Sequence, residues 1–448
     1  MVATLLVFAP LIRGGNRPMP LLVLELGALS MLVVMAWAGD LPTAWKRLPA
    51  ALRWALAILV AVPLVQLLPL PVSFWSALPG HAPYGRVLEV AGIEAGWRSI
   101  SINPVATQYA ALALLPCIAV LLALQVIARH KLRALALVFV AVAVCEALLG
   151  ILQVGAGSDS LLRLGNAFSG GAATGTYINR NHFAGLMAMA LPMLVAIWAA
   201  ETLPPRDQDG RAMLEHPRHA DAMLARRIAW SIVIVLVMAA LLFTRSRAGI
   251  GCGLAAFAAA ALGLVWRAGS VRIRVLLGAV SAMSLLLAAY VGLTPILERF
   301  APDELSLGYD GRLRIAAAAV RGALEFLPLG SGLGTFADVF RRYQSEGLLG
   351  FIDHAHNDYA EAFLEMGVAG IAFVALAAVA YLVRWKVLRL RGRSRTLGYL
   401  QVSAGLAVLA LALHGLFDFN FHIPANAFYF AFLAGIFLHD SSREQPAD

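Results

Sequence analysis

Apolar runs alternate with short polar segments along the whole chain. A helix that crosses a bilayer needs about 20 mostly apolar residues, and many of these runs reach or approach that length. We predict spans, with approximate bounds, at residues 1–12, 20–38, 52–71, 105–127, 132–154, 182–200, 227–243, 248–266, 272–295, 357–383, 397–418 and 423–439. The pattern therefore predicts an all-α polytopic membrane protein with about 12 transmembrane helices, which form one membrane domain over residues 1–448.

One polar, glycine-rich segment, residues 296–356, is longer than the other connections and separates the ninth predicted span from the tenth. We expect it to form a loop outside the bilayer that carries active-site residues. At the other end of the chain, no basic segment precedes the first apolar run and no cleavage site follows it, so we expect no removable signal peptide. The shortness of that first run leaves open a start further upstream.

The composition supports the membrane assignment, because 60% of the residues are hydrophobic and only 14% are charged. A soluble domain carries about 25% charged residues. The formal net charge of +9 is expected to reflect basic loops that meet anionic membrane lipid, so we expect no nucleic-acid partner. All three cysteines lie inside apolar runs without metal-binding spacing, which indicates buried side chains and neither disulfides nor metal ligands.

Lysine and arginine are concentrated in alternate loops, on the side that includes both chain ends. The positive-inside rule then places the N- and C-termini in the cytoplasm. With that orientation, polar motifs from distant parts of the chain all fall on the outer face. These motifs are "YINRNHFAG" (177–185), "FTRSRAG" (243–249), "GYDGRLR" (308–314), "DHAHNDY" (353–359) and "HGLFDFNFHIPAN" (414–426).

The two histidines of "DHAHNDY", His354 and His356, directly precede an apolar run. A histidine can take a proton from a hydroxyl group near neutral pH. Because the two are only two residues apart, we expect His356 to face a cleft as a general base and His354 to support it, with Asp353 or Asp358 orienting a ring. The alternative is that both are ordinary loop histidines in hydrogen bonds.

Asp358 and Glu361 have the spacing of a capping box at the start of a helix. Acidic side chains in a first helical turn also suit the helix dipole. A purely structural role is therefore a real alternative to substrate binding for this pair.

Arginines recur on the predicted outer face, where the positive-inside rule disfavours them. Their side chains often only extend to the membrane surface, which is the alternative to a functional role. However, the planar guanidinium matches phosphate oxygens, so the cluster predicts a site for an anionic, membrane-embedded ligand such as a lipid pyrophosphate. The residues concerned are Arg180, Arg245, Arg247, Arg312 and Arg314.

His414, Asp418 and His422 follow one another at intervals of four residues, a spacing that a metal site can use. Pro424 and the polar Asn420 indicate that the helix ends within this segment. We therefore expect hydrogen bonding between helices, or the wall of a cleft, and no metal and no cofactor.

Glu146 and Gln153 lie seven residues apart in the fifth predicted span, and so on one face of the helix. An acidic side chain inside the membrane needs a partner, and we expect an arginine of the outer cluster.

The motifs together resemble the superfamily of O-antigen ligases and Wzy-type polymerases. "FTRSRAG" is similar to that family when it is followed by a long outer segment ending "GSGLGTF…HAHNDYAEAFLEMGVAG". The segments "LIRGGNRP", "YINRNHFAG" and "DFNFHIPANA" are also similar to it, so the resemblance covers most of the chain.

The resemblance implies a glycosyltransferase of the bacterial inner membrane with its site on the periplasmic side. It implies transfer of a saccharide from a polyprenyl-pyrophosphate carrier to an acceptor hydroxyl without metal, and assigns Arg245, Arg247 and Arg312 to the pyrophosphate and His356 with Asn357 to the base. A single displacement with a base and no protein nucleophile would invert the anomeric centre. The full predicted set is His356 and His354 as catalytic residues, with Arg180, Arg245, Arg247, Arg312, Arg314, Asn357, Glu361 and Asp418 as substrate-binding residues.

Other functions compatible with this sequence are a lipid-linked saccharide flippase and a non-catalytic assembly protein. A transporter would need polar groups near the bilayer midplane and often two repeated halves, which the pattern lacks. Within the enzyme hypothesis the acceptor stays open. It could be lipid A-core, the growing glycan itself or a Ser/Thr of a protein, the last in a protein O-oligosaccharyltransferase.

Overall fold

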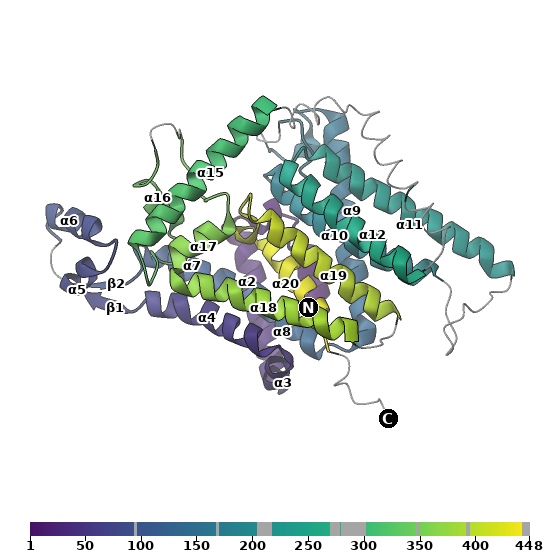
Figure 1. Cartoon of the computed structure of the whole chain (residues 1–448), viewed down its shortest axis with the longest axis horizontal. Coiled ribbons are helices and arrows are strands. Elements are labelled where there is room, and N and C mark those ends of the chain that lie inside the picture. Colours follow the sequence, from purple (N-terminus) through teal and green to yellow (C-terminus); the bar gives the residue numbers. More distant parts are fainter. Residues whose placement is uncertain are drawn as a thin grey trace.

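The computed structural model describes residues 1–93, 96–166, 170–203, 217–268, 302–345, 350–390 and 395–440, together with residues 278 and 348. In this part of the chain helices dominate, and the strands are confined to one short antiparallel pair (Figure 1). The fold class is therefore all-α, as the sequence predicts.

Eight helices within the described residues are long and apolar enough to cross a membrane, and a bent pair raises the number to nine. The eight are Pro18–Trp37 (α2), Pro104–Val126 (α7, Pro104–Ala113, with α8, Leu115–Val126), Arg129–Ala156 (α9), Arg180–Thr202 (α10), Asp221–Phe243 of α11 (Pro217–Phe243), Arg247–Leu264 of α12 (Arg247–Ala268), Val368–Leu388 of α18 (Val368–Leu390) and Thr396–His414 of α19 (Arg395–His414). The protein is thus a multi-pass membrane protein, but twelve spans are not confirmed.

Three predicted spans differ from helices of full length. Helix α1, Val2–Phe8, has only 7 residues and is followed by the 3-10 turn η1, Arg13–Gly15. Helix α4, Ala50–Gln66, is bent by 117° from α3, Asp40–Arg47. Helix α20, Pro424–Leu438, has 15 residues. Short apolar runs do not distinguish a full span from a buried half-span, and the predicted span 272–295 lies outside the described residues.

Helix α10 is the centre of the bundle, because 94% of its apolar window is buried inside the protein. It packs against α9, α11, α12 and α19 (Figure 1). By contrast, only 17% of the corresponding window of α18 is buried, so most of that helix is left to face lipid. The first side chains of α10, such as Asn181 and His182, are therefore buried among the neighbouring helices.

The predicted tenth span, 357–383, is two helices. Helix α17, Asp358–Met366, ends at Gly367, and α18 begins at the next residue. Gly367 has φ +58°, and a Cβ at this position would collide with the carbonyl oxygen of Pro328. Gly330 lies opposite, where a Cβ would collide with the carbonyl oxygen of Glu365. Two backbones cross here without side chains, and this close crossing ends α17.

The segment 296–356 is also not a plain loop. It contains α15, Pro302–Glu325, and the short α16, Phe336–Phe340. Ile315 and Ala319 of α15 share a buried apolar cluster with Leu364 of α17, and Figure 1 shows the two helices side by side. The sequence predicts a loop over residues 296–356. That prediction is wrong for α15, whose alanine-rich apolar stripe forms a helix.

A small appendage precedes α7 in the chain. Strands β1, Pro69–Pro71, and β2, Trp97–Ser99, pair antiparallel and flank α5, Val72–Ala77, and α6, Ala82–Val90.

Gln66, at the end of α4, donates to the carbonyl oxygens of Leu329 and Glu365 at 3.0 and 2.7 Å. This side chain attaches α4 to the chain crossing at the end of α17.

Candidate active site

The start of α10 directs polar side chains towards the segment that follows α19. Asn179 caps the helix by accepting a hydrogen bond from the backbone N–H of Asn181. Asn181 in turn donates its side-chain amide to Asp418 Oδ2 at 2.5 Å. His182 is buried, with Nε2 3.8 Å from Asp418 Oδ1. The first turn of α10 thus contacts both carboxylate oxygens of Asp418.

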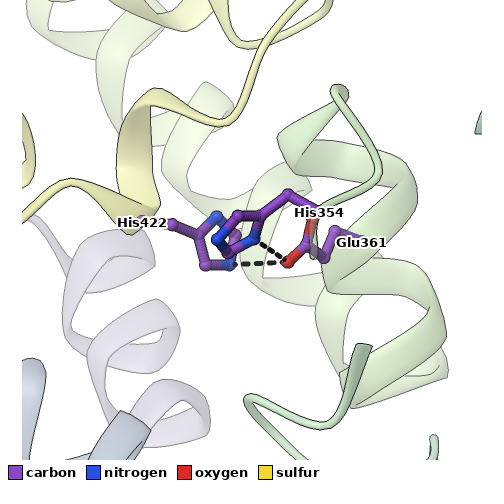
Figure 2. Close-up of side chains that lie close together, drawn as sticks. All are labelled: His354, Glu361 and His422. Atoms are coloured by element: carbon purple, nitrogen blue, oxygen red, sulfur yellow. Dashed lines mark hydrogen bonds and ion pairs between the residues drawn. The ribbon is translucent and has the colours of Figure 1, made fainter. Parts of the chain in front are cut away.

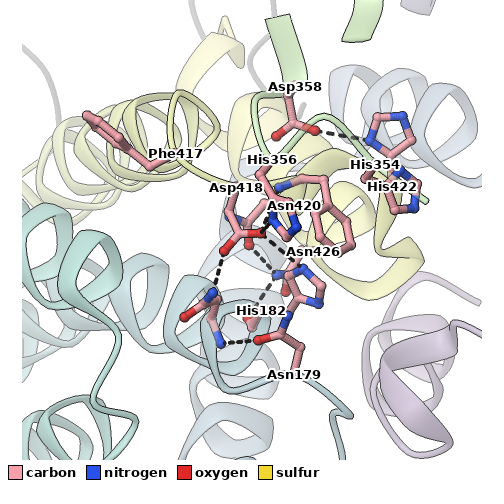
Figure 3. Close-up of polar contacts among 12 residues, drawn as sticks. Asn179, His182, His354, His356, Asp358, Phe417, Asp418, Asn420, His422 and Asn426 are labelled. Atoms are coloured by element: carbon pink, nitrogen blue, oxygen red, sulfur yellow. Dashed lines mark hydrogen bonds and ion pairs between the residues drawn. The ribbon is translucent and has the colours of Figure 1, made fainter. Parts of the chain in front are cut away.

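Asp418 is the carboxylate at the centre of this cluster, and its side chain has no exposure to solvent. Besides α10, it contacts two predicted site residues. His356 Nδ1 lies 3.4 Å from Oδ1 (Figure 3), and Arg312 Nη2 lies 3.6 Å from Oδ2. Burial alone would raise the pKa of Asp418. Interactions with His182, His356 and Arg312 outweigh that penalty and hold its pKa well below the usual range, so the group stays an anion.

His356 has an unusual backbone, with φ +49°. Residues other than glycine rarely adopt this left-handed conformation, and at functional sites it costs about 1–3 kcal/mol. The side chain is 26% exposed and meets Phe419 edge-on, with ring centroids 5.0 Å apart. If Nδ1 carries the hydrogen that faces Asp418, then Nε2 holds the lone pair and is the basic atom.

A second buried carboxylate, Glu361 of α17, lies on the other side of Phe419. Its Oε1 is 2.8 Å from His354 Nδ1 and 3.2 Å from His422 Nε2 (Figure 2). Its Oε2 accepts the backbone N–H of Ala355 at 2.7 Å. The His354 ring stacks on Phe419 with centroids 4.2 Å apart. Phe419 thus separates two histidine–carboxylate clusters.

His422 belongs to the 3-10 turn η4, Asn420–His422, and contacts a further acid. Its Nδ1 lies 3.1 Å from Asp358 Oδ1. Burial raises the pKa of Asp358 to about 6, although His422 offsets part of this increase. Burial also opposes the charge on His422, but Glu361 and Asp358 outweigh it and raise the pKa of His422 to about 10.

The other predicted arginines lie at turns and helix ends. Arg245 has φ +54° in the turn between α11 and α12, and Arg180 and Arg247 are the first residues of α10 and α12. The first turn of α12 packs against the end of α19, because a Cβ on Gly249 would lie 3.2 Å from the His414 ring. Arg314 instead donates to Ser345 at 3.1 Å.

Two predicted binding residues have structural contacts. Asn357, not Asp358, is the N-cap of α17: its side chain accepts from the N–H groups of Tyr359 and Ala360 and donates to the carbonyl oxygen of Leu416. The expected Asp358–Glu361 capping box is therefore wrong. Glu361 is 1% exposed and is surrounded by its histidine and backbone partners.

Glu146 also has a different partner from the predicted arginine. Its carboxylate accepts hydrogen bonds from the backbone N–H and the hydroxyl of Thr176, both at 2.9 Å. Gln153 accepts from Thr174 and donates to the carbonyl oxygen of Gly175. Both side chains therefore fix the segment that leads into α10.

Several site residues were not predicted from the sequence. Asn181, His182 and Phe419 do not belong to the predicted set of site residues. Asn426 donates to the carbonyl oxygen of His182 at 2.9 Å and to Asn420 Oδ1 at 3.0 Å. The available signal was the density of asparagines inside otherwise apolar segments, which are costly there without partners.

The spacing of His414, Asp418 and His422 does not produce one helix face, because α19 ends at His414. A different trio has converging ligand atoms: those of His354, Glu361 and His422 all lie within 4.8 Å of one another. In their chemistry two imidazoles and one carboxylate suit a divalent transition metal, so this cluster is one that could hold an ion.

Comparison with known families identifies residues 232–375 with the family described as O-antigen ligase. The chain thus carries an O-antigen ligase domain, from an enzymatic family that transfers glycans, and the resemblance predicted from the motifs is confirmed there. The matched region includes Arg245, Arg247, Arg312 and both histidines of the "HAHN" segment. Comparison with curated proteins found no match.

Proposed function

We propose that this protein is a metal-independent, inverting glycosyltransferase of the bacterial inner membrane. It transfers a saccharide from a polyprenyl-pyrophosphate carrier to an acceptor hydroxyl on the periplasmic face, as an O-antigen ligase or a polysaccharide polymerase. The observation that carries the proposal is the buried Asp418, which contacts both His356 and Arg312. One carboxylate thereby brings a candidate base and a candidate anion-binding group together.

His356 is the general base of the proposed reaction. The acceptor oxygen attacks the anomeric carbon and forms the new glycosidic bond, while the bond from that carbon to the pyrophosphate oxygen breaks. The hydroxyl proton goes to Nε2 of His356, and the electron pair leaves with pyrophosphate. Asp418 orients the ring through Nδ1 and stabilises the imidazolium that forms. A single displacement of this kind inverts the configuration of the anomeric carbon.

Arginine side chains stabilise the pyrophosphate leaving group. Arg312 is 37% exposed, and its Nη1 donates to the carbonyl oxygen of Phe417 at 2.7 Å. These contacts fix the guanidinium while it still reaches solvent. In the proposed site Arg245, in the turn before α12, and Arg247, its first residue, add positive charge for the same anion. A preorganised donor in a dry site contributes about 3 kcal/mol to transition-state stabilisation.

The decisive experiment is donor binding and turnover by the purified protein in lipid nanodiscs. The donor is a polyprenyl-pyrophosphate-linked saccharide, and the acceptors are lipid A-core, a free glycan and a Ser/Thr-containing peptide in parallel. We expect transfer to one acceptor class, with inversion and with no loss in EDTA. Absence of transfer to all three, or retention of configuration, would reject the proposal, and the preferred acceptor would distinguish ligase from polymerase and from protein O-oligosaccharyltransferase.

The proposed orientation places the site in the periplasm and both termini in the cytoplasm. Leu416 lies beside the site and is 42% exposed, whereas Lys386 is exposed near the opposite end of α18. A membrane-impermeant thiol reagent applied to intact spheroplasts should label Leu416→Cys and not Lys386→Cys. The reverse pattern would place the site in the cytoplasm.

A further inference from the structure

His356, the general base of the proposed mechanism, has a strained backbone conformation. Its φ of +49° lies in the left-handed region, which non-glycine residues rarely adopt, although histidine does so more often than most. Contacts on both sides must therefore hold it. Those contacts identify a residue outside the predicted set.

On the N-terminal side of His356, the anchor is Glu361. Its two carboxylate oxygens accept the backbone N–H of Ala355 at 2.7 Å and the ring Nδ1 of His354 at 2.8 Å. Glu361 is 1% exposed, so these are charge-assisted bonds shielded from water. The two residues before the base are thereby tied to the first turn of α17.

On the C-terminal side of His356, the anchor is Asp358. Its backbone N–H donates to the carbonyl oxygen of Gly415 at 2.8 Å, and its side chain meets His422 Nδ1 at 3.1 Å. His422 reaches the other anchor through Nε2, 3.2 Å from Glu361 Oε1. One ring therefore connects the carboxylates on both sides of the strained residue (Figures 2 and 3).

The chemistry of these contacts defines the protonation state of the ring. A carboxylate only accepts hydrogen bonds, and a neutral imidazole donates from only one nitrogen. Both nitrogens of His422 face carboxylate oxygens at hydrogen-bond distance, so both must carry hydrogen to avoid a lone-pair repulsion. The groups that face this cation are Asp358, Glu361, the more distant Glu365 and the neighbouring His354 ring.

We propose that His422 is a positioning residue: as an imidazolium bound to Asp358 and Glu361, it holds the loop that presents His356 to the acceptor. This inference rests on the proposed function only for its effect on turnover. The bridge itself is a statement about the ring and its two carboxylates. The raised pKa of His422, about 10, agrees with the geometry.

A metal ion is the competing occupant of the same atoms, because His354, Glu361 and His422 converge. The hydrogen-bond set is complete without an ion. His422 Nδ1 contacts Asp358 Oδ1, the Ala355 N–H donates to Glu361 Oε2, and Glu361 Oε1 is hydrogen-bonded to His354 Nδ1 and ion-paired with His422 Nε2. The observations therefore favour protons, and the ion becomes an outcome of the test.

The direct test is ¹⁵N NMR of histidine-labelled protein in nanodiscs, with His422→Gln to assign the ring and elemental analysis of the same samples. Ring ¹⁵N shifts separate the cation, the neutral tautomers and a metal-bound ring. We expect the cation from pH 6.5 to 9 and no stoichiometric metal. A neutral ring, or one equivalent of a transition metal that His422→Gln abolishes, would overturn the proposal.

The functional test compares His422→Gln and His422→Lys with His130→Gln, an exposed histidine at the start of α9. Loss of positioning should lower kcat by roughly 10–100-fold with donor affinity unchanged, lysine should recover part of it, and His130→Gln should match the wild type. Unchanged kcat in a folded His422→Gln protein would refute the positioning role. If the ring is a cation but His356→Ala stays active, the proposed function fails and the bridge stands.

Discussion

Asp418 and Glu361 are two buried carboxylates on opposite sides of Phe419, each surrounded by histidines, and they differ in what completes their shells. Asp418 contacts Arg312 and His356, whose side chains are 37% and 26% exposed. Glu361 contacts a backbone N–H and two histidine rings, one of them tied to another buried acid. Both clusters reach solvent, the second through His354 and His422, which are 22% and 29% exposed. Only the first includes an arginine, whereas the second also binds a backbone N–H.

The difference indicates a division of labour between chemically similar groups. Sequence alone gives both clusters the same residue types, a histidine near an acid. Under the proposed function, one carboxylate stabilises the proton taken up by His356, while the other accepts a backbone N–H. The following predictions test that division.

The largest effect is expected for His356→Ala. Removing the base should lower turnover by roughly 10²–10⁴-fold while donor binding stays nearly intact, since the histidine acts on the acceptor. The measurement is transfer rate and donor affinity on the same purified variant. His354→Ala should lose less, because that ring contacts Glu361 and not Asp418. A dead His354→Ala with an active His356→Ala would reverse the two roles.

Asp418→Asn should have the next largest effect, a loss of roughly 10²–10³-fold in kcat. The amide keeps the shape but loses the charge that stabilises the His356 imidazolium and attracts Arg312. Asp338→Asn is the matched control, because Asp338 is an acid that accepts only an exposed hydrogen bond from Asn103. Equal losses in the two variants would mean that Asp418 acts through folding and not through the base.

Arg312→Lys should lose about tenfold in kcat/KM, and Arg312→Ala about 10²-fold. Lysine keeps the positive charge but cannot donate to Phe417 and a phosphate with one planar group. Arg321→Lys, an exposed change on the same helix α15, should be neutral. A fully active Arg312→Ala would remove this residue from the anion site.

The smallest effect concerns pH and stability. The pKa of His422 is raised from 6.5 to about 10 in the folded protein, so its bridge stabilises fully below pH 6.5 and the contribution is lost as the pH rises through 10. The Tm of the wild type should exceed that of His422→Gln by about 2–5 °C near neutral pH, and the gap should narrow towards pH 10. A gap that widens with pH would contradict the cationic bridge.

The sequence was sufficient where the signal is local and long. The apolar runs that became α9, α10 and α12 were placed within a few residues, because twenty apolar residues in water have few alternatives to a membrane span. Similar reasoning predicts functional roles for the histidine segment and the arginines, since ionisable groups beside such runs are costly unless they have partners.

The pairings could not be predicted, because they depend on how distant helices meet. Asp418 lies 62 residues from His356 in the chain, and His422 lies 64 from Asp358. The predicted span 397–418 includes Asp418, whereas α19 ends at His414, so Asp418 lies in the segment that follows the helix. Likewise, the hydrophobic periodicity of the sequence does not predict that α17 ends at Gly367. The backbone of Pro328, which lies against Gly367, imposes that end.

The crossing of Gly330 and Gly367 sets a limit on recombining proteins of this kind. Each glycine occupies space that the other strand's backbone requires, so the two positions behave as a single inherited unit. A chimaera that takes its outer helices from one parent and its late spans from another would join incompatible surfaces at this point. Exchanges should therefore carry residues 302–367 together.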